Sequence, residues 1–122
     1  MIRLKPGVDL DSVHPKIYFA IIMADQVWKQ LGFEEVWVTA ANEPGHTTNP
    51  DPMRQFHLLP DGTCQACDLR IHQFTPENKK EARRILASIL GKEYDVILES
   101  EGKANEHIHV QYDPNRPGTA VA

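Results

Sequence analysis

Two stretches of the chain carry apolar residues at helical spacing. In residues 15–32 the apolar positions recur three and four apart, which predicts an amphipathic helix that starts near Pro15 and ends at the following glycine. The second stretch, residues 76–90, is preceded by Thr75 as N-cap and followed by Gly91. These flanking residues are typical of a helix start and a helix end, so a second helix is expected there.

Four shorter stretches predict strands. They are rich in β-branched and aromatic residues, and they cover residues 35–40, 64–71, 94–99 and 107–112. The last two are close enough in sequence to form an antiparallel hairpin. Residues 1–13 are expected to be a short extended segment before the first helix. The resulting order predicts an α+β domain: a small, mainly antiparallel sheet with helices packed on one face.

A long irregular stretch separates the first two predicted strands. Residues 41–60 hold several prolines and a glycine together with His46 and His57. A loop of this length inside a small domain is usually functional or disordered, and the two histidines favour a function. The tail from about residue 114 is expected to be flexible.

Size and charge narrow the possible functions. The chain has 122 residues and a formal net charge of −4. This length suits one domain spanning residues 1–122. The charge gives no broad footprint for nucleic acid, and no apolar run predicts a membrane span. The N-terminal residues do not resemble a secretory signal, so synthesis in the cytoplasm is expected, and the protein is expected to be a monomer.

The run Glu106-His107-Ile108-His109 is the strongest chemical signal in the chain. Because side chains alternate along a strand, His107 and His109 are expected to point to the same face. An earlier carboxylate, Asp68, and the earlier His57 add further candidate ligands. Two imidazoles, a ligand carboxylate and a spare carboxylate are the groups that a catalytic zinc site requires.

Taken together, these residues resemble a family of zinc peptidases. The family includes D-Ala-D-Ala carboxypeptidases, vancomycin-resistance dipeptidases and phage endolysins that cut L-Ala–D-Glu bonds. Its pattern is a His, then an Asp after a small residue, then an acidic residue three positions before a final His. Here the matching pieces are His57, Ala66-Cys67-Asp68-Leu69-Arg70 and Glu106-His107-Ile108-His109. The resemblance implies a Hedgehog/DD-peptidase-like fold with a zinc cleft on the sheet.

The resemblance also implies a role for each matched residue. His57, Asp68 and His109 would bind zinc, and Glu106 would deprotonate the zinc-bound water. His107 would face the active site and stabilise the oxyanion or hold the substrate.

Two further residues are expected near this site. His46 and Arg70 are possible substrate-binding residues. The substrate would be the peptide stem of peptidoglycan, which the protein would reach at the cell wall after release from the cell.

Two departures from the family pattern keep other readings open. The separation of His57 from Asp68 is eleven positions, longer than is usual in the family. Many members also carry an Arg just after the first strand, whereas residues 39–44 of this chain contain none. One alternative is therefore a catalytically impaired module that retains zinc and binds cell-wall peptides. Another is a structural or interaction domain without metal. The spacing of Cys64 and Cys67 also allows a redox pair, although simple packing is the favoured interpretation.

Overall fold

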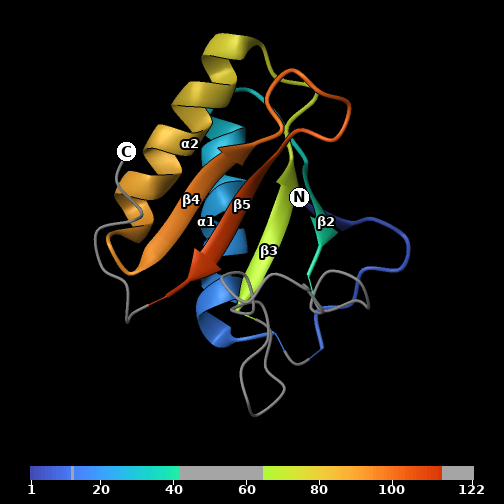
Figure 1. Ribbon diagram of the computed structural model, residues 1–122, viewed down its shortest axis with the longest axis vertical. Coiled ribbons are helices and arrows are strands. Elements are labelled where there is room, and N and C mark those ends of the chain that lie inside the picture. Colours follow the sequence, from blue (N-terminus) through green and yellow to red (C-terminus); the bar gives the residue numbers. More distant parts are fainter. Residues whose placement is uncertain (12, 42–64, 114–122) are drawn as a thin grey trace.

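A five-stranded sheet and two helices form the part of the chain that the computed structural model describes, residues 1–11, 13–41 and 65–113 (Figure 1). In chain order the elements are β1 (Ile2–Leu4), α1 (Pro15–Gln30), β2 (Val36–Ala40), β3 (Ala66–Arg70), α2 (Pro76–Leu90), β4 (Tyr94–Glu99) and β5 (His107–Tyr112). The α+β class and the mainly antiparallel sheet are confirmed. The predicted flexible tail from residue 114 lies outside the described residues.

The strands lie in the order β1-β2-β3-β5-β4. β1 and β2 run parallel, with Ile2 opposite Val36 and Leu4 opposite Val38. This corrects the sequence prediction, which gave residues 1–13 only as an extended segment. Three residues are too few to show a strand period, and the partner strand follows only after a whole helix, so no local pattern reveals the pairing.

The other three pairings are antiparallel and place β5 between β3 and β4. The predicted hairpin of β4 and β5 is confirmed, and in it Glu99 lies opposite His107. On the other side of β5, Asp68 lies opposite His109 and Arg70 lies opposite His107. β5 therefore carries its two histidines into the middle of three adjacent strands.

Both helices begin where capping residues satisfy their first free amides. The Nδ1 atom of His14 accepts a hydrogen bond from the Lys16 amide at 3.0 Å, just before Pro15 opens α1. The hydroxyl of Thr75 accepts one from the Asn78 amide at 3.1 Å at the start of α2. The predicted helices are confirmed. Neither described helix combines the length and the apolar character that crossing a membrane requires.

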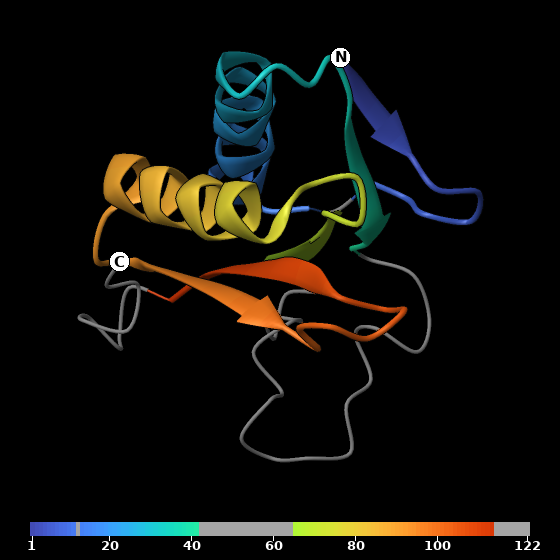
Figure 2. The same ribbon diagram turned by 90° about the horizontal axis from the view of Figure 1, so that it is seen from above.

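Both helices pack on the same side of the sheet, as Figure 2 shows. Leu69, Ile108 and Val110 project toward them and are fully buried. They join apolar residues of the helices, namely Ile17, Ala20, Ala24, Val27, Trp28, Ala82 and Leu86. We call this side of the sheet the helix face.

Because side chains alternate along strands, the neighbours of these core residues point to the opposite side of the sheet. We call this side the polar face. Its residues on the three adjacent strands include Asp68, Arg70, Glu99, His107 and His109. The strand alternation thus separates the apolar core from a group of ionisable side chains.

Candidate functional site

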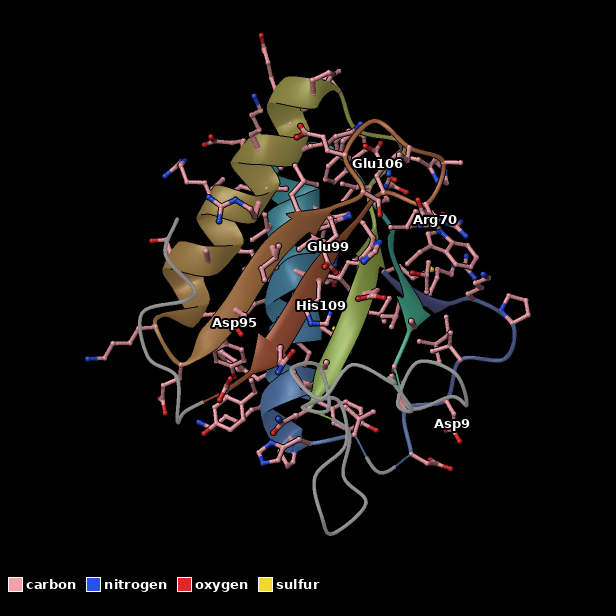
Figure 3. The ribbon with its side chains drawn as sticks, viewed as in Figure 1. Asp9, Arg70, Asp95, Glu99, Glu106 and His109 are labelled. Carbon is pink, nitrogen blue, oxygen red and sulfur yellow. The ribbon has the colours of Figure 1, made fainter. Side chains whose placement is uncertain are left out.

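Three side chains from three strands converge on the polar face. Asp68 of β3, Glu99 of β4 and His109 of β5 each offer a ligand atom, and these atoms lie within 4.8 Å of one another. Figure 3 shows Glu99 and His109 on the two neighbouring strands of the hairpin. The register of the sheet brings together residues that are distant in sequence, so the cluster depends on the fold.

The ring of His109 donates hydrogen bonds from both of its nitrogens. Nδ1 donates to Asp68 Oδ1 at 2.9 Å, and Nε2 donates to Gln111 Oε1 at 3.0 Å. Burial of the ring opposes its charged form, but the hydrogen bond and the charge of Asp68 outweigh burial and raise the pKa of His109. Both contacts therefore favour the protonated imidazole.

The ring of His107 is held in the same way by Glu99. Its Nε2 atom donates to Glu99 Oε1 at 3.1 Å, and its Nδ1 atom donates to the Asn105 carbonyl at 2.8 Å. The bond to Glu99 is the main cause that raises the pKa of His107 to about 9, and the same bond lowers the pKa of Glu99. Asp68 Oδ1 lies 3.7 Å from His107 Nε2 and adds to the effect.

Two imidazoles and two carboxylates thus stabilise each other's charged forms on the polar face. A divalent cation would take over the charge balance if the imidazoles released their protons, because a ligand histidine must be neutral. The donor set of carboxylate and imidazole is one that zinc accepts. The residues present therefore fit a zinc ion, with Asp68, Glu99 and His109 close enough to share one.

Of the three predicted zinc ligands, the structure describes Asp68 and His109, and these two lie together. Asp68 and His109 are direct neighbours, and His107 points to the same cluster. The third predicted ligand, His57, and the possible substrate-binding residue His46 lie outside the described residues.

Glu106, the predicted base, has other partners. One of its carboxylate oxygens forms an ion pair with Lys79 Nζ of α2, and the other accepts a hydrogen bond from the Gly102 amide at 3.0 Å. The bond with Lys79 is the main cause that lowers the pKa of Glu106. The carboxylate is nearly buried, with only 7% of its side chain exposed. Both oxygens therefore already have partners outside the cluster of Asp68, Glu99 and His109.

Glu99 is the residue that sequence reasoning missed. It ends β4 and looks like an ordinary polar strand terminus, yet its carboxylate lies 3.1 Å from His107 and 3.8 Å from His109. The available signal was the predicted hairpin, because pairing Glu99 with His107 puts both side chains on one face. The long connection between the two strands left that register undetermined in the sequence.

A cavity of about 420 Å³ opens beside the cluster. Its lining includes Thr39, Asp68, Arg70, Glu106 and His107. Arg70, predicted as a possible substrate-binding residue, is thus placed at the wall of this cavity. Its guanidinium carbon lies 5.0 Å from the centre of the Trp37 ring on β2.

Cys67 points away from this site. It is fully buried in the core on the helix face, which agrees with the favoured packing interpretation. Cys64 lies outside the described residues, so a redox pair stays a prediction.

Comparison of the chain with protein-family models, with curated proteins and with solved structures finds no match.

Proposed function

We propose that this chain is a zinc-dependent peptidase with a Hedgehog/DD-peptidase-like fold. The observation that carries the proposal is the convergence of Asp68, Glu99 and His109 on one face of the sheet. The proposed substrate is a peptide bond involving a D-amino acid in the peptidoglycan stem, reached at the cell wall after release. This choice of substrate rests on the motifs around Asp68 and His109.

In this proposal Asp68 and His109 hold the ion, and His57 completes the set as the motif implies. Zinc bound there supplies a Lewis acid that polarises the scissile carbonyl and makes water more acidic. Asp68 Oδ1 and His109 Nδ1 already lie 2.9 Å apart, joined by the His109 proton. An ion bound there would replace that proton, because a ligand histidine must be neutral.

We assign the role of base to Glu99. Its Oε1 atom borders the ligands, and 27% of its side chain is exposed, so water can reach it. Glu106, in contrast, is neutralised by Lys79 and has both oxygens engaged. The Glu99 carboxylate would accept the proton of the attacking water and return it to the leaving amine.

His107 would stabilise the negative charge that develops on the substrate. Its Nε2 atom carries a proton that now points to Glu99, with a pKa of about 9. When Glu99 takes a proton from water, this N–H becomes available to an oxyanion that develops on the substrate carbonyl. Glu99 would thus transfer a proton, while His107 would donate a hydrogen bond to the oxyanion.

The test compares two conservative variants on zinc-loaded protein, with a synthetic stem peptide as substrate. Glu99→Gln should lower the cleavage rate by about 10²- to 10⁴-fold, the usual contribution of a general base. Glu106→Gln should lower it by less than about tenfold, because both oxygens of Glu106 are already engaged by Lys79 and the Gly102 amide. Zinc content, measured by elemental analysis, should be unchanged in Glu106→Gln.

The reverse order of the two effects would reject Glu99 and restore Glu106 as the base. Wild-type protein that holds no zinc even after zinc is added would reject the whole proposal. In that case the cluster would be a set of ion pairs in a domain without metal.

One observation favours a second candidate function. The ion pair with Lys79 occupies the carboxylate that the motif assigns to catalysis, as expected for a module that retains zinc and binds cell-wall peptides without cleaving them. Stoichiometric zinc and peptide binding with no product over long incubation would support this candidate.

A further inference from the structure

A second cavity lies next to the candidate site. It measures about 750 Å³ and is lined by Arg3, Lys29, Phe33, Glu35, Trp37 and Arg70, among others. Arg70 and His72 line both this cavity and the one beside Asp68. The two cavities are therefore adjacent at the end of β3, with Arg70 on the wall of each.

The sheet register explains this arrangement. Arg3 of β1 pairs with Trp37 of β2, and Arg70 of β3 pairs with His107 of β5, which pairs with Glu99. Because Arg70 also contacts Trp37, the side chains form one continuous row across the polar face. In order, the row is Arg3, Trp37, Arg70, His107 and Glu99. In Figure 3 Arg70 lies toward β2, on the opposite side of β3 from Glu99.

The charges in this row are not equivalent. Arg3 is ion-paired with Glu35, and Lys29 lies 3.1 Å from a carboxylate oxygen of Asp25. Arg70 has no ion pair with any described residue, and its guanidinium carbon lies over the Trp37 ring, 5.0 Å from the ring centre. The planar guanidinium carries N–H donors in a fixed fork that matches the two oxygens of a carboxylate.

We infer that Arg70 and Trp37 form a subsite for a carboxylate of the substrate, one or two residues from the scissile bond. The spacing follows from β3, since Arg70 stands two residues from Asp68, about 7 Å along the strand. The inference rests on the proposed function for the position of the scissile bond. It adds that the stem peptide is preferred when its D-glutamate carries a free carboxylate.

The experiment uses a matched pair of peptides, L-Ala-γ-D-Glu-L-Lys-D-Ala and the same peptide with the D-glutamate α-carboxylate amidated. Binding to the whole protein is followed by tryptophan fluorescence, without zinc and with zinc under conditions that prevent turnover. Trp37 lines the subsite, whereas Trp28 is fully buried in the core and serves as a constant background. This readout does not depend on hydrolysis.

Wild-type protein should bind the carboxylate peptide about 10- to 100-fold more tightly than the amide, the range for a charge-assisted hydrogen-bonded pair. Arg70→Gln should remove this preference without changing the zinc content, and Arg70→Lys should restore only part of it. The matched control is Arg3→Gln, which should keep the preference because Arg3 is paired with Glu35.

Equal affinity of wild type for both peptides would overturn the inference, as would an Arg70→Gln variant that weakens both peptides alike. Failure of the proposed function has a different signature, because absent zinc or absent cleavage leaves a carboxylate preference of the zinc-free protein measurable. The two ideas can therefore fail separately.

Discussion

The two faces of the sheet use the same strands for opposite purposes. Leu69 and Ile108 turn toward the helices and are fully buried, whereas their chain neighbours Asp68, His107 and His109 turn to the polar face. The apolar set stabilises the fold through burial, and the ionisable set is held in place by that fold. Stability and chemistry are thus separated by the direction of a side chain, even between adjacent residues.

The largest expected loss of stability comes from a substitution on the helix face. Leu69→Ala should lower the free energy of unfolding by about 2–5 kcal/mol, because it leaves a cavity at a fully buried site. Arg70→Gln, its neighbour on the polar face, should cost at most about 1 kcal/mol, the range for losing its contact with Trp37. Urea unfolding followed by circular dichroism measures both. Equal costs would contradict the separation of the two faces.

The next largest effect is the stabilisation expected when zinc binds to the polar face. Zinc at one hundred times its dissociation constant should raise the free energy of unfolding by about 2.7 kcal/mol. His109→Ala should abolish this gain, while Leu69→Ala should keep it despite its lower stability. Thermal unfolding with and without zinc gives the comparison, and an equal gain in His109→Ala would place the ion elsewhere.

A smaller effect comes from proton binding to the metal-free protein. The bond to Glu99 raises the pKa of His107 from 6.5 to about 9, so the folded state binds this proton more tightly than the unfolded state. The resulting stabilisation is complete below about pH 6.5 and is lost as the pH rises through 9. Unfolding by urea at pH 6.5 and pH 9.5, with a chelator present, should show this loss.

His107→Gln is the control for that measurement and should flatten the pH dependence. A wild-type stability that stays level between the two pH values would mean that His107 is not paired with Glu99 in solution.

The smallest effect concerns the pair between Glu106, just before β5, and Lys79 of α2. Glu106→Gln should lower the free energy of unfolding by about 1–2 kcal/mol, because it leaves the nearly buried Lys79 ammonium without its counter-charge while the amide keeps the shape of the carboxylate. Lys79→Gln should cause a similar loss, and the double variant should cost less than the two single losses added together. A purely additive double variant would indicate that the two side chains do not interact.

The sequence predicted the helices well because their signals are local. Thr75, Pro76 and Gly91 mark the start and end of α2 directly, and Pro15 does the same for the start of α1. The strand β1 gave no such signal, since its three residues pair with a strand beyond α1. Its recognition needs the whole fold.

The residues of the candidate site also divide into those with a local sequence signal and those that only the fold reveals. Asp68 and His109 could be named from their motifs, because ligand types and spacing are visible along the chain. The place of Glu99 depends on which residue of β5 it faces, and the partners of Glu106 depend on the packing of α2 against the sheet. Such relations follow from tertiary structure and leave no trace in local patterns.

The cross-strand pairing of Asp68 with His109 has a consequence for the choice of ion. The backbone ladder, with a strand spacing of about 4.8 Å, keeps a carboxylate oxygen and an imidazole nitrogen side by side. Calcium takes six to eight oxygen ligands, whereas imidazole nitrogen suits zinc and similar metals. A site built on this pair would therefore favour zinc over calcium.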